Sequence, residues 1–198
     1  MGKGRLEAFS DGVLAIIITI MVLELKTPVG EHLSDLRPLL PVLGSYVISF
    51  VYVATYWNNH HHLFLTIRTA SARVLWANMC LLFCLSLMPF GTAWMGETHF
   101  APVPTAVYGL ILLACGGAYW LLQSAILATE GRDSVLGRAL GSDRKAKATL
   151  TILVVAVACA LWVPLLAAAL CGVVDVLWVI PDRRIERALA EEGSDVAD

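Results

Sequence analysis

The sequence predicts an all-α integral membrane protein with six transmembrane helices in each subunit. The chain has 198 residues, of which 58% are hydrophobic and only 15% are charged. Soluble domains carry about 45–50% apolar and about 25% charged residues. The mean hydropathy is +0.74, and the charged residues cluster between long apolar runs. We expect one transmembrane domain over residues 1–185 and a short acidic tail over residues 186–198.

Apolar runs long enough for membrane helices define the expected elements. They cover approximately residues 5–25, 39–65, 74–94, 105–128, 148–161 and 165–180. A bilayer core takes about 20 helical residues, so the first four runs can each cross it. We expect Pro89 to kink the third helix and Pro164 to divide the last 32 residues or so into two short helices.

The basic residues predict the orientation in the membrane. With six crossings, most of them fall on one side, and Lys26 and Arg37 fall on the other. Because positive residues favour the cytoplasmic side, we expect a multi-pass protein of the cell membrane with both termini cytoplasmic. The residues on the expected cytoplasmic side are Lys3, Arg5, Arg68, Arg73, Arg132, Arg138, Arg144, Lys145, Lys147, Arg183, Arg184 and Arg187.

The first helix has a polar start that an ordinary membrane anchor lacks. Ser10 and Asp11 lie about two turns into the apolar run, and polar groups at membrane depth are costly unless they are paired. If the first two helices are antiparallel, Asp11 could meet His60 or His61 in a buried network. Alternatively, Ser10 and Asp11 could simply cap the helix. The spacing alone leaves both interpretations open.

These residues resemble the signature of a known family. Arg5, Phe9, Ser10 and Asp11 match the RxxxFSD signature of the transmembrane-protein-175 potassium channels, whose bacterial members are of similar length and have six membrane helices. The resemblance implies a homotetrameric, potassium-selective cation channel lined by the first helix of each subunit. It further implies that polar signature residues hold this helix against its neighbours. The expected network comprises Arg5, Phe9, Ser10, Asp11, Trp57, His60, His61 and Asn78.

The expected selectivity residues lie on one face of the first helix. The chain has no TVGYG sequence, so a ring of backbone carbonyls of that type is not available, and a constriction would have to consist of side chains. Ile16, Ile20 and Leu23 recur at helical spacing, and Thr19 lies beside them. We expect these four residues to form the pore, and the resemblance implies that Ile16 forms its narrowest ring.

Other functions are less well supported by the sequence. His60, His61 and His62 point about 100° apart on a helix and cannot all bind one ion, so we expect no metal site and no cofactor, only permeating potassium ions. Asp11, Asp175 and the histidines could instead form the relay of a proton-coupled secondary transporter, but the internal repeats typical of transporters are absent. No motif of an enzyme active site or basic nucleic-acid-binding face is present. The expected partners are the lipid bilayer and further copies of the chain.

Overall fold

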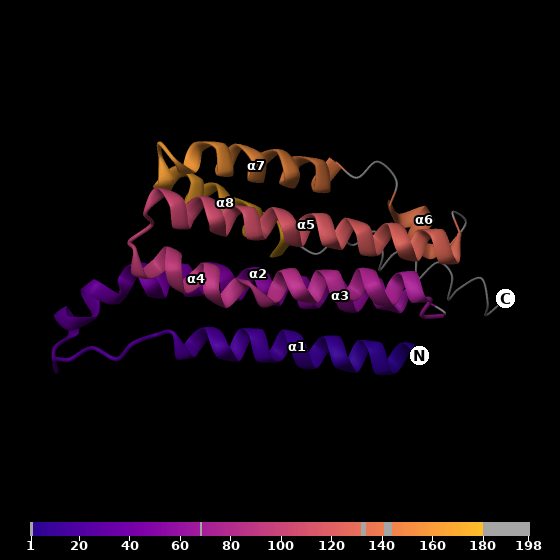
Figure 1. Cartoon of the computed structure of the whole chain (residues 1–198), viewed down its shortest axis with the longest axis horizontal. Coiled ribbons are helices and arrows are strands. Elements are labelled where there is room, and N and C mark those ends of the chain that lie inside the picture. The colour runs from indigo at the N-terminus through magenta and orange to yellow at the C-terminus, as the bar shows by residue number, and fades with distance from the viewer. Residues whose placement is uncertain (1, 68, 132–133, 141–143, 180–198) are drawn as a thin grey trace.

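The computed structural model is an all-helical bundle in the residues that it describes, which are 2–67, 69–131, 134–140 and 144–179. The long helices run along one common direction (Figure 1). They are α1 (Lys3–Leu23), η1 (Leu33–Leu39), α2 (Leu40–Leu65), α3 (Ala72–Ser86), α4 (Met88–Glu97), α5 (Pro102–Glu130), α6 (Val135–Leu140), α7 (Arg144–Ala160) and α8 (Pro164–Val179).

Helices cover each of the six predicted apolar runs in the described residues, with breaks where the prolines predict them. The third is divided at Leu87 into α3 and α4, and Pro89 lies at the start of α4. Proline has no backbone N–H and cannot continue the hydrogen-bond ladder, which accounts for this break. A turn over 161–163 separates α7 from α8, and Pro164 is the first residue of α8.

Among the described residues, four helical stretches are long and apolar enough to cross a membrane. They are Lys3–Leu23, Leu33–Leu65, Ala72–Glu97 and Pro102–Glu130. The last two helices are shorter, with 17 residues in α7 and 16 in α8. Six complete crossings therefore remain a prediction.

Two segments predicted as loops contain helical turns. The short 3-10 helix η1 begins in the connection between the first two predicted runs and leads directly into α2. The short helix α6 lies in the connection between the fourth and fifth predicted runs. The acidic tail and the last three arginines named above lie outside the described residues.

The helices alternate in direction, so the connections gather at two ends. The N-terminus, the turn after α2 and the turn after α5 lie at one end, and the turns after α1, α4 and α7 lie at the other (Figure 1). The first end carries Lys3, Arg73 and Lys147, whereas Lys26 and Arg37 belong to the opposite end. This arrangement matches the predicted charge asymmetry, and the assignment of the first end to the cytoplasm remains a prediction.

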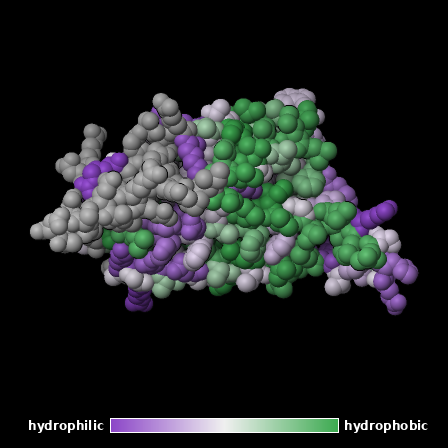
Figure 2. Space-filling view, turned by 180° about the vertical axis from the view of Figure 1, so that it is seen from behind, coloured by the Kyte–Doolittle hydropathy of each residue, from purple (hydrophilic) through white to green (hydrophobic). Residues whose placement is uncertain are grey.

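The outer surface has the distribution of polarity that a bilayer requires. Hydrophobic side chains form a band across the middle of the molecule, and hydrophilic side chains lie toward both ends (Figure 2). Large apolar side chains such as Trp76, Phe83 and Trp120 are exposed on the bundle. Such an extensive apolar surface is unfavourable in water but suits lipid chains.

The contact between α2 and α4 depends on a glycine. A Cβ atom added at Gly96 would lie 2.8 Å from the Cα atom of Val42 and would also meet the Oγ atom of Ser45. A backbone atom cannot move away cheaply, so glycine allows these two helices to approach closely. Nearby, the hydroxyl of Ser49 lies 3.0 Å from that of Tyr108, which joins α2 to α5.

Gly96→Ala should therefore destabilise the bundle. We expect a loss of about 1–3 kcal/mol in the free energy of unfolding, because the added methyl group forces α2 and α4 apart. The measurement is thermal unfolding in detergent, with Gly44→Ala in α2 as the control, since a Cβ there meets no atom within 4 Å. Equal stability of the two variants would contradict the close helix contact.

Candidate functional site

Helix α1 has one packed face and one open face. Leu6, Ser10, Leu14, Ile17 and Met21 are buried, and they recur at steps of three or four residues. This face packs against α2, α3 and α4. Helix α1 lies along one edge of the bundle, so its opposite face has no covering element in the described chain (Figure 1).

A buried chain of hydrogen bonds joins α1 to two other helices. The amide nitrogen Nδ2 of Asn78 in α3 donates to the Ser10 Oγ atom over 2.9 Å. Its Oδ1 atom lies 2.8 Å from Nε2 of His60 in α2. The Ser10 hydroxyl in turn donates to the carbonyl of Leu6 over 2.9 Å. Ser10 and Asn78 are fully buried and His60 is 1% exposed, so water cannot replace these partners.

Further polar contacts join α1 to α2 nearer the surface. The indole Nε1 of Trp57 donates to Oδ1 of Asp11 over 3.0 Å. One turn toward the N-terminal end, Nδ1 of His61 lies 3.4 Å from Oε1 of Glu7. The partner of Asp11 is thus Trp57, while the histidines that were considered for Asp11 contact Asn78 and Glu7.

The capping interpretation of Ser10 and Asp11 is wrong. Helix α1 begins at Lys3 with Gly2 at the N-cap, so both residues lie well inside the helix. Their side chains instead contact neighbouring helices.

Arg5 and Phe9 do not belong to these contacts within the chain. Both side chains are exposed, Phe9 to 50%, and in the described part of the chain no hydrogen bond or ion pair of the Arg5 side chain is found. On a helix of 3.6 residues per turn, these two residues lie on the same side as the predicted pore residues. The predicted network thus consists of residues that contact neighbouring helices and of two, Arg5 and Phe9, whose side chains are exposed.

The predicted pore residues all lie on the open face of α1. Ile16 is 57% exposed, Ile20 is 41% exposed and Leu23 is 78% exposed. Thr19 is also exposed, and its hydroxyl lies 3.0 Å from the backbone carbonyls of Ala15 and Ile16. Because the hydroxyl donates its proton to the helix, its lone pairs remain available on the open side.

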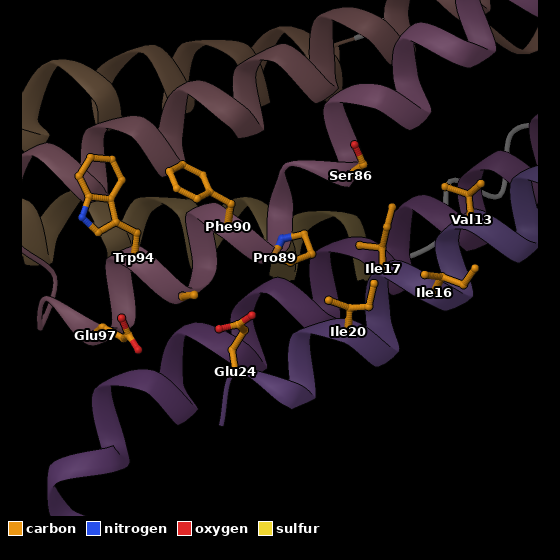
Figure 3. Close-up of a pocket in the computed structure, with 11 residues that line it drawn as sticks. Val13, Ile16, Ile17, Ile20, Glu24, Ser86, Pro89, Phe90, Trp94 and Glu97 are labelled. Carbon is orange, nitrogen blue, oxygen red and sulfur yellow. The ribbon is translucent and has the colours of Figure 1, made fainter. Parts of the chain in front are cut away.

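Part of this face forms one wall of an open apolar groove of about 800 Å³. Ile16, Ile17 and Ile20 lie on the α1 side, and Pro89 and Trp94 lie on the side of α4 (Figure 3). Glu24 and Glu97 lie at the end of the groove that is farther from the N-terminus.

A surface ion pair lies near this end of α1. The Nζ atom of Lys26 lies 2.5 Å from Oε1 of Glu97, which connects the loop after α1 to the end of α4. The hydrogen bond and the negative charge of Glu97 raise the pKa of Lys26. Both side chains are exposed, so the pair adds little to stability.

Sequence reasoning missed the pairing of Glu7 with His61. The signal was present in the spacing, because Glu7 and Asp11 are four residues apart, as are Trp57 and His61. Residues four apart share a helix face, so two antiparallel helices can align both pairs at once. The Ser49–Tyr108 contact was also missed, and single hydroxyl residues in apolar helices give no comparable pattern.

Comparisons with known proteins agree with this architecture. The family model "Endosomal/lysosomal potassium channel TMEM175" matches residues 5–89, which include most of α1 and all of α2 and α3. A potassium channel of a Chryseobacterium species is 49% identical over 191 residues, which are 96% of this chain and 100% of that protein. The endosomal/lysosomal proton channel TMEM175 of Rattus norvegicus is 29% identical over 143 residues, covering 65% of this chain and 28% of that protein.

A solved structure has a similar fold over almost the whole chain. The crystal structure of a lysosomal potassium-selective channel TMEM175 homolog from Chamaesiphon minutus matches with a TM-score of 0.77 and 28% sequence identity. The match covers 91% of this chain and 97% of that one. The helical bundle is therefore similar in fold to a known potassium-selective channel homolog.

Asn78→Leu should weaken the attachment of α1 to the bundle. The change removes the partner of the buried Ser10 and His60 side chains, so we expect the free energy of unfolding to fall by about 1–3 kcal/mol. Thermal unfolding in detergent measures it. The matched control in α3 is Ser86→Ala, because Ser86 is exposed and donates only to the carbonyl of Phe83 in its own helix. Identical unfolding of the two variants would show that the buried chain does not hold α1.

Proposed function

The chain belongs to the endosomal/lysosomal potassium channel TMEM175 family, and from this membership we propose that it forms a potassium-selective channel lined by α1. The family is one of channels and not of enzymes. The single observation that carries the proposal about the pore is the open face of α1. Its exposed Ile16, Thr19 and Leu23 side chains lie opposite the face that the rest of the bundle fixes.

The polar contacts of α1 support its role as a pore wall. A helix that lines a pore must keep one rotation about its axis, because a turn of a few tens of degrees would exchange the residues facing the ions. The contacts of Ser10 with Asn78 and of Asp11 with Trp57 fix that rotation from two neighbouring helices. Polar pairing inside the membrane is costly to break, which favours a rigid pore wall.

The proposed constriction consists of apolar rings and one hydroxyl ring. Copies of α1 around an axis would place Ile16, Ile20 and Leu23 in successive rings, with Thr19 between them. A hydrophobic ring resists entry of a hydrated ion, and potassium gives up its water at a lower cost than sodium does. The lone pairs of Thr19 can replace part of the lost hydration. These residues would thus favour potassium without a carbonyl filter.

An α1-lined pore requires several copies of the chain. One chain supplies one α1, so a closed wall needs rotational symmetry, and we propose a homotetramer. The exposed Arg5 and Phe9 lie near the N-terminal end of the same open side and are available to a neighbouring subunit. The bilayer surrounds the assembly, and we propose that both termini face the cytoplasm of a cell membrane.

The proton-coupled transporter interpretation has less support. The polar residues considered for a relay are divided among separate contacts, since His60 pairs with Asn78 and His61 with Glu7. Asp175 lies in α8 and lines a different cavity, which shares no lining residue with the groove beside α1.

Recordings from purified protein in planar lipid bilayers test the function directly. With a potassium gradient and equal pH on both sides, we expect currents that reverse near the potassium equilibrium potential. Replacing potassium with sodium on one side should then reduce the current in that direction. An electroneutral exchanger would carry no current, and a proton-selective channel would reverse near the proton equilibrium potential. Either result would contradict the proposal.

Ile16→Asn tests the constriction itself. We expect larger cation currents and weaker discrimination between potassium and sodium, because a polar side chain wets and widens the narrowest ring. The matched control is Val22→Asn, since Val22 is also an exposed aliphatic residue of α1 but lies about 120° away around the helix. Unchanged current and selectivity in the Ile16 variant would remove this residue from the pore.

A further inference from the structure

A second cavity lies within one subunit, away from α1. It has a volume of about 410 Å³. Its lining residues come from α2, α5, α7 and α8, and none of them belongs to α1, α3 or α4. A volume of several hundred cubic ångströms is typical of sites for small organic ligands.

The cavity contains a buried carboxylate without a partner. Asp175 is only 4% exposed, and within the described residues neither of its carboxylate oxygens has a hydrogen-bond partner. Besides Asp175, the lining contains one further charged residue, Lys147. Among the ion pairs found in the described part of the chain, none joins Lys147 to Asp175. A carboxyl group deep in a membrane helix without a partner is costly and indicates a functional site.

Five aromatic side chains are among the residues that line the cavity with Asp175. Their polar atoms are mostly used in other contacts: the Tyr52 hydroxyl donates to the carbonyl of Leu112 over 3.1 Å, and the Trp178 indole donates to the Thr149 hydroxyl over 2.8 Å. The faces of such rings attract organic cations. The aromatic lining residues are Tyr52, Tyr56, Tyr119, Trp120 and Trp178.

Two glycines leave the α5 wall of the cavity bare. A Cβ atom added at Gly116 or Gly117 would meet no heavy atom within 4 Å. Both residues line the cavity. The space beside them is therefore open to a ligand, and a larger side chain there would fill it.

We propose that this cavity binds a hydrophobic organic amine, with its ammonium group on Asp175 and its apolar part between the aromatic walls. A charged nitrogen would supply the hydrogen-bond donor and the positive charge that the carboxylate lacks. A metal ion fits less well, because no group of three ligating acidic, histidine or cysteine side chains is found in the described residues. A purely apolar lipid chain would leave the carboxylate without a partner.

The site is independent of the proposed pore. Its lining shares no residue with the open face of α1, so an amine would bind each subunit whether or not the assembly conducts ions. Binding can therefore be measured on the purified protein in detergent without recording currents.

Calorimetric titration with 2-(1-naphthyl)ethylamine tests the proposal, and 2-(1-naphthyl)ethanol is the uncharged counterpart. We expect one amine bound per chain and an affinity for the alcohol that is lower by about tenfold or more, because it lacks the charge. Asp175→Asn should lower the amine affinity by about tenfold or more and leave the alcohol unaffected.

A second variant separates this cavity from other amine sites. Gly116→Leu should abolish binding of both compounds, because the leucine side chain fills the cavity. This effect is steric and leaves Asp175 unchanged. The control is Gly172→Leu in α8, because a Cβ there also meets open space but Gly172 lies outside the lining. Each variant is first checked for the elution volume of the wild-type oligomer, so that loss of binding is not loss of folding.

Three results would overturn the proposal. They are the absence of amine binding to the wild-type chain at millimolar concentration, equal affinity for amine and alcohol, and binding that survives Gly116→Leu. If Asp175→Asn does not fold, the comparison of the two compounds and the Gly116 variant still decides the outcome.

Discussion

The buried hydrogen bonds between α1 and its neighbours are the constraint on which the rest of the structure depends. Ser10, Asn78 and His60 are removed from water and must satisfy one another, because neither lipid nor apolar side chains can replace the lost hydrogen bonds. Apolar packing alone would permit α1 to rotate, since one branched side chain substitutes readily for another. The polar chain permits one rotation, and the contact of Asp11 with Trp57 supports the same one.

That rotation decides which residues remain uncovered. Once Ser10 faces α3, Leu14, Ile17 and Met21 are buried, while Ile16 and Leu23 lie on the open side. The open side is apolar apart from Thr19 near the C-terminal end of α1 and the charged ends of the helix. A single helix with such a face would be an ordinary lipid-exposed helix. Family membership and the exact placement of the polar contacts together favour a pore wall.

The sequence predicted the helices well because membrane segments follow from hydropathy and length. The break at Leu87 and the turn before Pro164 were also predictable, since proline has a definite effect on a helix. The contacts between helices were less predictable. The sequence placed Ser10, Asp11 and His60 at the same end of the bundle, but the choice of Trp57 as the partner of Asp11 depends on helix rotation.

Features that arise from the meeting of several helices were not visible in the sequence. The cavity around Asp175 combines residues of four helices that are more than 100 positions apart at their extremes. From the sequence, Asp175 was only an isolated carboxyl group in an apolar segment. The close contact at Gly96 likewise depends on where α2 passes, and a glycine near a helix end carries no distinctive signal.

The central claim is that α1 of each subunit faces a common pore, and block of an Ile16→Cys channel by cadmium ions tests it most directly. Thiols from neighbouring subunits would lie around one narrow ring and bind the ion together, so current should fall at micromolar cadmium and recover with a chelator. The wild-type chain controls for its five cysteines, and Val22→Cys controls for an exposed thiol elsewhere on α1. Equal cadmium sensitivity of all three proteins would contradict the claim that Ile16 lines the pore.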